Sequence, residues 1–462
     1  MTTGAGNLER GLDRASGTRP IPGNALTHHA DSARALGAMV ALIAEARAWV
    51  HLENYIIRDD ATGRRFADVL EERAREGVRV RVLYDAFGSR GTSGGYWHRL
   101  RRAGVEVRPF NPPWRGRPFH LLRRDHRKLL VVDGDRAMVG GLCVGDEWAG
   151  DRARGRQPWR DTALGLRGPA AAALDATFAR VWRRAGAPLP GEELSADPAE
   201  CGPTAVRIVE GVPHGARIWR VLGLLATTVL ERLWITDAYL VPPAAIVAGL
   251  VDAARAGVDV RVLVPGATDI PVVRAATRIG YRDLLHAGIR LFEWRGPMLH
   301  AKTFVADRRW VRVGSSNLNV SSLLTNYELD VLVDDEPLAI DVAEQYRRDT
   351  AESREVVLVA RRRLPPRITD AAVAPEQAPP AHQRSAAERA RTAAVALRQV
   401  AGGLRRRLAA AATGLAAVLG GLLLVFPHVM SVTLAVGAFW TAFLFGWYAL
   451  FQRARTQSDD AP

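Results

Sequence analysis

Lysine is almost absent from this sequence of 462 residues: only positions 128 and 302 carry it, so 61 of the 63 basic residues are arginines. A P-loop nucleotide site needs a lysine that follows a glycine, and neither lysine does, so this class of nucleotide enzyme is excluded. The formal net charge is nevertheless +14. A surface this basic attracts phosphate-bearing partners, either nucleic acid or anionic lipid headgroups.

Cysteine is equally scarce. Cys143 and Cys201 form no CxxC pair, so we expect neither a disulfide framework nor a zinc site, which fits a reducing compartment. The N-terminal stretch has no apolar run of the kind that a cleaved secretion signal contains, and we expect none. The length favours two or three domains.

The chain contains an internal repeat. Three segments recur at offsets of 180 to 184: residues 77–83 as 257–263, 103–105 as 287–289, and 53–56 as 237–240. A repeat of this length indicates one duplicated structural unit with small insertions.

Helical and strand patterns alternate within each unit. The first unit predicts helices over 33–48 and 65–76 and strands over 49–56 and 78–84; the second predicts helices over 217–231 and 243–256 and strands over 232–239 and 258–264. Short apolar runs at Lys128–Val132 and Thr303–Val305 add further strands. This alternation predicts the α/β class, with largely buried strands.

Composition divides the chain into seven parts. We expect an N-terminal segment 1–30, a first half 31–185, a linker 186–205, a second half 206–360, a Pro/Ala-rich linker 361–383, a basic amphipathic helix 384–407 and an apolar stretch 408–451. The basic helix is either a solvated charged helix or one that lies on anionic lipid.

The apolar stretch 408–451 contains no charged residue. It is too long for one membrane crossing, which takes about 20 residues, and Pro427-His428 divides it into two spans. Arginines flank both ends, so the positive-inside rule predicts a transmembrane hairpin with both ends in the cytoplasm. A pair of buried core helices is the alternative, but apolarity around the whole circumference favours the membrane.

Both lysines lie two residues after a histidine. His126 and Lys128 are followed by Asp133, and His300 and Lys302 are followed at the same spacing by Asp307. One such pair could arise by chance, but two pairs at matching places in a repeat could not. Residues i and i+2 of a strand share one face, so each ring and its ammonium project together.

An ammonium beside an imidazole is suited to phosphate. The lysine binds the non-bridging oxygens while the ring reaches phosphorus, and Ser315, Ser316 and Asn317 supply neutral donors a short loop later. One histidine cannot attack phosphorus and protonate the leaving group at the same time. We therefore expect the two halves to bring one imidazole each to a single site.

These motifs resemble the paired HxKxxxxD motifs of the phospholipase D superfamily, over nearly all of residues 30–350, and are most similar to those of bacterial cardiolipin synthases. The stretches that carry the resemblance are 122–128, 269–274 and 314–318. The resemblance implies two α/β/α halves related by a pseudo-twofold axis, one active site at their interface, and a mechanism without a metal or other cofactor.

The resemblance also implies the roles of the site residues. One histidine, for which we take His126, forms a covalent phosphatidyl-histidine, and His300 acts as acid and base. The lysine and the aspartate of each motif, Lys128 with Asp133 and Lys302 with Asp307, are expected to belong to the catalytic set as well. An acidic residue after each motif, Asp161 and Glu328, orients a histidine. Both substrates would be phosphatidylglycerol, with no nucleic acid as partner, and the catalytic part would lie on the cytoplasmic face of a bacterial inner membrane.

Three alternatives remain open at this point. The same histidine pair serves a hydrolytic phospholipase D, which releases phosphatidic acid, and a nuclease of the same superfamily. A lipid-binding protein with a decayed site is the non-enzymatic alternative. Its motivation is Cys143, which stands where the family pattern has asparagine, because a thiol is a poor hydrogen-bond donor.

Overall fold

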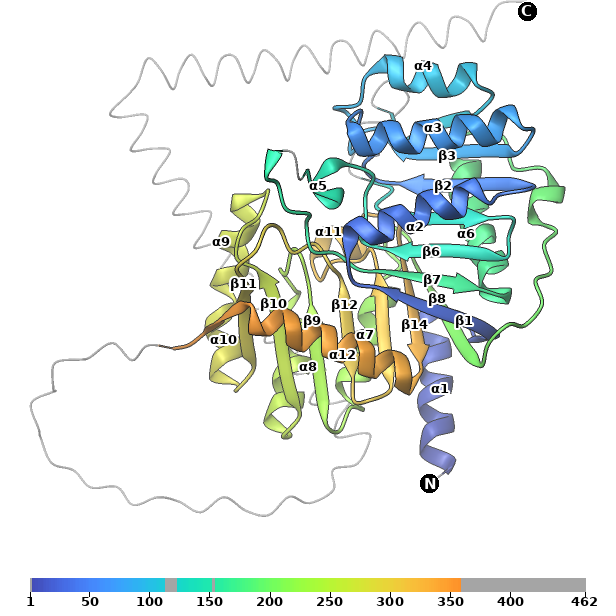
Figure 1. Cartoon of the computed structure of the whole chain (residues 1–462). Helices are drawn as coiled ribbons and strands as arrows, with labels where there is room; N and C mark the ends of the chain where they lie inside the picture. Colours follow the sequence, from blue (N-terminus) through green and yellow to red (C-terminus); the bar gives the residue numbers. More distant parts are fainter. Residues whose placement is uncertain (1, 113–122, 152–153, 359–462) are drawn as a thin grey trace, which may run out of the picture. The chain divides into compact units, whose positions relative to one another are not determined.

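The computed structural model describes residues 2–112, 123–151 and 154–358 (Figure 1). All of them belong to one unit, Met1–Arg363. The expected Pro/Ala-rich linker, basic helix and apolar hairpin lie outside the described residues. Within the described ranges, no helix has both the length and the apolarity that a membrane crossing requires.

Within the described residues, fifteen strands form one sheet, in the order β15-β11-β10-β9-β12-β13-β14-β8-β1-β7-β6-β5-β2-β3-β4. The first seven along the chain are β1 (Ile21–His29), β2 (Trp49–Asn54), β3 (Arg79–Asp85), β4 (Glu106–Phe110), β5 (Lys128–Val132), β6 (Arg136–Gly140) and β7 (Ala163–Arg167). The others are β8 (Thr204–Gly211), β9 (Arg232–Thr236), β10 (Asp259–Pro265), β11 (Arg290–Trp294), β12 (Thr303–Ala306), β13 (Trp310–Gly314), β14 (Glu328–Asp334) and β15 (Ser353–Val356).

The strand order repeats outward from the central pair β1–β8. It reads β1-β7-β6-β5-β2-β3-β4 on one side and β8-β14-β13-β12-β9-β10-β11 on the other, and β1 pairs antiparallel with β8. The expectation of an α/β fold built from two repeated halves is thereby confirmed. In Figure 1 the strands of the first half run horizontally and those of the second half run vertically, so the sheet turns between the halves.

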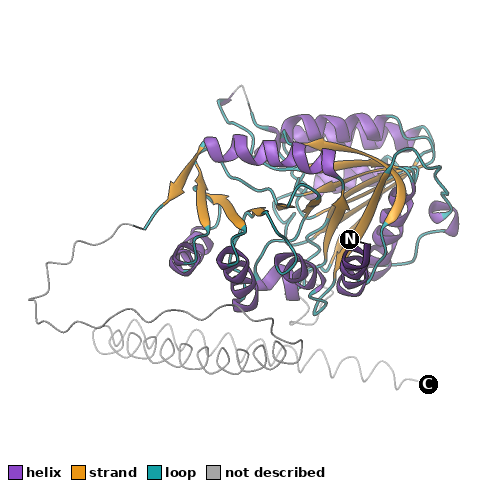
Figure 2. Ribbon diagram, turned by 90° about the horizontal axis from the view of Figure 1, so that it is seen from below, coloured by secondary structure: helices purple, strands orange, loops and turns teal. Residues whose placement is uncertain are grey.

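Helices cover both faces of the sheet (Figure 2). They are α1 (Thr2–Ser16), α2 (Ser32–Ala44), α3 (Ala61–Arg75), α4 (Gly94–Arg102), α5 (Asp146–Ala149), α6 (Pro169–Ala185), the 3₁₀ turn η3 (Gly191–Leu194), α7 (Arg217–Ala226), α8 (Ala244–Arg255), α9 (Pro271–Ile279), α10 (Tyr281–His286), α11 (Val320–Leu324) and α12 (Glu336–Ala351). One apolar cluster consists of residues from α6, α12 and strands of both halves. Two further clusters form the cores of the second and the first half. Side-chain caps begin several helices, as Asp31 does for α2 and Asp60 for α3.

The predicted boundaries differ from the structure at the N-terminus. The expected segment 1–30 is not separate from the first half, because β1 lies inside the sheet between β7 and β8. Helix α1 instead packs on the second half: Leu12 is fully buried there, and Arg207 of β8 pairs with Glu9 and Asp13. The segment 2–29 therefore ties the halves together.

Two further predictions need correction. The helix predicted over 217–231 ends at Ala226, where the hydroxyls of Thr227 and Thr228 bond to carbonyls of its last turn. The expected linker 186–205 contains η3, whose Glu193 is fully buried against His51 and Arg81. A buried carboxylate with two partners fixes this stretch to the first half.

Both histidines stand at the same topological position. In the first half β2, β3 and β4 run parallel, and β5 is antiparallel to β2, with Asn54 opposite Lys128. Hence β5 begins at the edge where the parallel strands end. The second half repeats this with β9, β10, β11 and β12. We call this edge of each half its histidine edge.

Candidate active site

The two histidine edges are joined by backbone hydrogen bonds. The N–H of His126 donates to the carbonyl of Tyr327 at 2.9 Å, and the N–H of His300 donates to the carbonyl of Arg160 at 2.7 Å. Tyr327 immediately precedes Glu328, and Arg160 immediately precedes Asp161. Each half therefore delivers an acidic residue to the histidine of the other half.

The side chains also pair between the two halves. Nδ1 of His126 lies 2.9 and 3.1 Å from the carboxylate oxygens of Glu328, and Nδ1 of His300 lies 2.7 Å from Oδ2 of Asp161. All four side chains are buried. The carboxylates predicted to orient a histidine thus each contact the imidazole of the opposite half.

The carboxylates decide which ring nitrogen is available. An ionised carboxylate only accepts hydrogen bonds, so Nδ1 of each neutral ring carries the hydrogen and Nε2 keeps its lone pair. Neither Nε2 has a hydrogen-bond partner among the described residues. Both Nε2 atoms are therefore available to a bound substrate.

Each carboxylate is itself held in place. Asp161 accepts a hydrogen bond from the indole Nε1 of Trp148 at 3.0 Å. Glu328 accepts from the hydroxyl of Ser315 at 2.5 Å and from that of Ser322. Such second partners fix the orientation of each carboxylate.

The lysines and two tyrosines complete a repeated arrangement. Each lysine Nζ donates to the carbonyl of the histidine two residues before it. Nζ of Lys128 lies 5.1 Å from the ring centre of Tyr55, and Nζ of Lys302 lies 5.9 Å from that of Tyr239. Tyr55 also meets His126 edge-on. Two buried ammonium groups with aromatic walls form an environment suited to an anion.

Burial lowers the pKa of both imidazoles; the neighbouring lysine lowers it further, while the paired carboxylate raises it. The pKa of Asp161 falls to about 2, because His300 and Lys302 outweigh the opposing effect of burial. Glu328 also has a lowered pKa, since His126 and Lys128 outweigh burial in the same way. In the free protein at neutral pH, both rings are neutral and both carboxylates are ionised.

The structure does not leave the predicted serine donors free for phosphate. Ser315 donates to Glu328, and Ser316 donates to Asp330, so both hydroxyls support carboxylates instead. Asn317 differs: its side chain makes no hydrogen bond to another described residue, so its buried Oδ1 is unpaired and its Nδ2 remains a donor for phosphate. Of the three predicted phosphate contacts, only the carboxamide of Asn317 is uncommitted.

Asp133 and Asp307 are not brought to the imidazoles. They follow β5 and β12, at the far end of strands that begin beside the histidines, so about 16 Å of strand separates them from the site. Asp133 accepts from the backbone N–H groups of residues 47, 48 and 49, and Asp307 from those of 230, 231 and 232. Both adopt positive φ, near 52°. We interpret these motif aspartates as anchors of the turns before β2 and β9.

Cys143 occupies the position equivalent to Asn317. It is buried, and burial raises the pKa of its thiol although the neighbouring Lys128 lowers it. The thiol is therefore neutral at pH 7 and cannot replace a carboxamide as a donor. The two halves of the site differ at this position.

Several aromatic residues of the site had no predicted role. Trp148 and Trp159 pack around the ring of His300, at centroid distances of 5.3 and 5.8 Å. Tyr55 and Tyr239 were visible as equivalent positions of the repeat, and that equivalence was the signal that could have identified them. No sequence signal marked the tryptophans, because they have no counterpart in the second half.

The sequence matches the family model described as "Cardiolipin synthase, PLD-like domain" over residues 39–146 and 224–350, one histidine–lysine pair in each segment. Cardiolipin synthase A of Pseudomonas aeruginosa is 35% identical over 348 residues, which cover 75% of this chain and 71% of that protein. The chain belongs to this family. A cardiolipin synthase of Geobacillus kaustophilus is 36% identical over 306 residues, covering 64% of this chain and 60% of that protein. The expected enzyme class, a phosphatidyltransferase of the phospholipase D type, is thereby confirmed.

A solved structure shares the fold of this cardiolipin synthase family member. Phosphatidylserine synthase of Haemophilus influenzae aligns with a TM-score of 0.60 at 14% identity, covering 76% of this chain and 92% of that one. At this identity the likeness concerns the fold alone.

Proposed function

We propose that this chain transfers the phosphatidyl group of one phosphatidylglycerol to the headgroup hydroxyl of another, producing cardiolipin and releasing glycerol. The observation that carries the proposal is the crossed pair of imidazoles: each is held by a carboxylate of the other half, and each keeps a free Nε2. The names of the relatives, cardiolipin synthases, support this choice of product.

In the first step, Nε2 of His126 attacks the phosphorus of the donor lipid. A P–N bond forms, the P–O bond to glycerol breaks, and His300 gives its proton to the departing oxygen. Binding the phosphodiester anion favours protonation of a neighbouring ring, which supplies the acid that the free protein lacks. Asp161 then stabilises the His300 imidazolium.

In the second step, the now neutral His300 removes the proton from a headgroup hydroxyl of the second lipid. The oxygen attacks phosphorus, the P–N bond breaks and His126 is regenerated neutral. Both ammonium groups balance the charge on the non-bridging oxygens, and Asn317 adds a neutral donor from the second half. Water at the same position would give phosphatidic acid instead.

The expected location follows from the sequence. The apolar hairpin 408–451, with arginines at both ends, would hold the catalytic halves at the cytoplasmic surface of a bacterial inner membrane. Fractionation of cells that produce the full chain tests this directly. Recovery of the chain in the soluble fraction at low salt would contradict it.

Product analysis tests the reaction. Purified full chain with phosphatidylglycerol vesicles should give equal amounts of cardiolipin and glycerol by mass spectrometry, and His126→Ala and His300→Ala should each abolish both. Phosphatidic acid as the sole lipid product would favour the hydrolytic phospholipase D. Cleavage of DNA without any lipid turnover would favour the nuclease.

A further inference from the structure

Helix α9 turns its apolar side outward. Its apolar residues lie mainly on one face, but Ala275 and Ile279 on that face are exposed, Ile279 at 82%. None of the described side chains of α9 is fully buried. A surface helix of a soluble domain normally places its apolar face against the core. This helix does the reverse.

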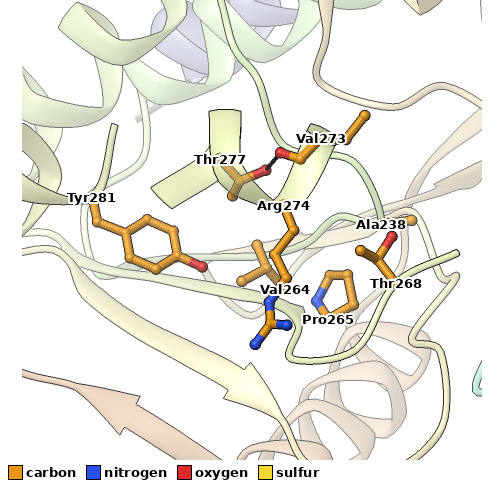
Figure 3. Close-up of a pocket in the computed structure, with 8 residues that line it drawn as sticks. All are labelled: Ala238, Val264, Pro265, Thr268, Val273, Arg274, Thr277 and Tyr281. Atoms are coloured by element: carbon orange, nitrogen blue, oxygen red, sulfur yellow. Dashed lines mark hydrogen bonds between the residues drawn. The ribbon is translucent and has the colours of Figure 1, made fainter. Parts of the chain in front are cut away.

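The inner side of α9 meets the core through side chains that are only partly buried. Val273 and Thr277 face Val264 and Tyr281 across a cavity of about 10 Å³ (Figure 3). Thr277 bonds to a carbonyl of its own helix rather than to the body of the protein. The contact with the core therefore does not account for the apolar residues of α9.

Helix α9 begins next to the active site. The hydroxyl of Tyr239, which meets His300 edge-on, donates to Asp269 at 2.7 Å. The next residue, Ile270, is 40% exposed and precedes α9. The side chain of Asn319 donates to the backbone carbonyl of the same tyrosine, and the following Val320 is 51% exposed. Two exposed apolar side chains thus flank one wall of the site.

Arginines border this apolar surface. Arg274 and Arg278 lie one turn apart on α9, next to the exposed Ala275 and Ile279, and Arg282 follows on α10. Arg278 also pairs with Glu293, and Arg274 is exposed. An apolar helix face with arginines along one side is the pattern of a helix that lies in a lipid interface.

The first half presents a similar feature after the equivalent strand. Phe87 follows β3, the counterpart of β10, and is 54% exposed. The guanidinium groups of Arg90 and Arg124 lie 4.6 and 5.8 Å from its ring centre. An aromatic ring with two cations is suited to the boundary between headgroups and acyl chains.

We propose that these side chains, namely Phe87, Ile270, Ala275, Ile279 and Val320, form a docking rim that seats the active site on an anionic lipid bilayer. The inference rests on the proposed function, because a lipid-transferring site has reason to lie at the membrane surface. The arginines match anionic headgroups, and the apolar side chains enter the outer part of the acyl region. The rim contacts the membrane through the catalytic halves themselves, in addition to any anchor beyond them.

A fluorescent label on the full chain tests the rim without requiring turnover. Ile279→Cys carries the label in a background in which the exposed Cys201 is replaced by serine. The matched control is Leu230→Cys, since Leu230 is 83% exposed and lies just before β9, at the opposite edge of the same half-sheet. Vesicles consist of phosphatidylcholine with or without phosphatidylglycerol.

The label at 279 should shift its emission to shorter wavelength on vesicles containing phosphatidylglycerol and be quenched by brominated acyl chains. The label at 230 should do neither. If the two labels behaved alike, the docking rim would be overturned. It would also be overturned if the label at 279 already emitted at shorter wavelength than the label at 230 without vesicles, because another protein surface would then cover this face.

An activity measurement separates the rim from the proposed reaction. Ile279→Asp should lower turnover of phosphatidylglycerol in vesicles by on the order of ten-fold. It should leave turnover of a short-chain, monomerically dissolved phosphatidylglycerol unchanged, and Leu230→Asp should change neither. An equal loss on both substrates would contradict docking. Complete inactivity of the unmodified chain would count against the reaction but leave the label experiment decisive for the rim.

Discussion

At the residue scale, the two halves of the site match in their histidine, lysine and tyrosine and differ at the position of Asn317. Both halves supply histidine, lysine and tyrosine at equivalent positions, and each receives a carboxylate from the other. Asn317 has no equivalent donor, because Cys143 stands in its place. The second half should therefore contribute more neutral hydrogen bonding to the substrate phosphate than the first.

This asymmetry predicts unequal effects of truncation. Asn317→Ala removes an uncommitted carboxamide and should lower kcat/KM on phosphatidylglycerol by about 10–100-fold. Cys143→Ala removes a neutral thiol and should change it by less than about three-fold. If kcat/KM fell equally in the two variants, Cys143 would contribute to phosphate binding as much as Asn317 does.

The alkaline limit of activity should depend on Lys302. Burial lowers its pKa to about 8, and Lys128 adds to this effect while Asp161 opposes it. The ammonium is charged below that pH and loses its charge above it, so kcat/KM should fall as the pH rises through about 8. Arginine keeps its charge throughout this range.

We therefore expect Lys302→Arg to have a lower maximal kcat/KM that declines less steeply between about pH 7 and about pH 9 than that of the unmodified chain, because guanidinium does not titrate there. A pH profile of kcat/KM for both forms makes the comparison. An alkaline limb that is identical in the two forms would assign the titration to another group.

At the element scale, the motif aspartates support strands rather than chemistry. Each accepts three backbone N–H groups of the turn before β2 or β9. Asp133→Ala leaves those donors without their partner and should lower the free energy of unfolding by about 1–3 kcal/mol. Because the carboxylate lies far from the rings, the turnover rate at a temperature where the variant is folded should stay within about three-fold.

Asp133→Asn is the control for this prediction. Asparagine keeps one acceptor oxygen and tolerates the positive φ at this position, so it should lose less stability than alanine. Thermal unfolding and initial rates measured on the same preparations decide the matter. If the turnover rate instead fell by about a hundred-fold while stability was unchanged, Asp133 would belong to the chemistry.

Much of the element pattern could be predicted from the sequence. The strand predicted at Lys128–Val132 has the bounds of β5, and the strands predicted at 78–84 and 258–264 differ from β3 and β10 by one residue at each end. Long amphipathic helices and buried strands carry strong periodicity. Strand β1 was missed because Pro22, Gly23 and Asn24 interrupt its alternation, and only pairing on both sides makes it a strand.

At the scale of the whole molecule, the crossing of the carboxylates could not be derived from the sequence. The repeat indicated two halves and one shared site, but each acid follows the motif of its own half along the chain. Only the turn of the sheet between the halves brings Asp161 to His300 and Glu328 to His126. In the same place, the hydroxyl of Ser315 donates to Glu328. It is therefore not free for the phosphate contact that the sequence predicted.

The two halves are also locked by a buried ion pair. Arg127, between the first motif's histidine and lysine, is fully buried and donates to Glu210 of β8 at 3.0 Å. Glu210 also accepts from Arg180, so removing Arg127 should cost less than the about 3–5 kcal/mol that is typical when a buried charge loses its sole partner. Arg127 therefore stabilises the contact between the two halves, although it does not face the substrate.

The central claim is that His126 carries the phosphatidyl group while His300 handles protons. A donor lipid with a phenol leaving group tests it most directly, because an acidic phenol departs without a proton from His300. In His300→Ala, the first step should then proceed and the second should stall, since no base activates the acceptor. Mass spectrometry after an alkaline denaturing quench should find one phosphatidyl group on His126. Absence of any adduct on that histidine, with the phenol still released, would contradict the claim.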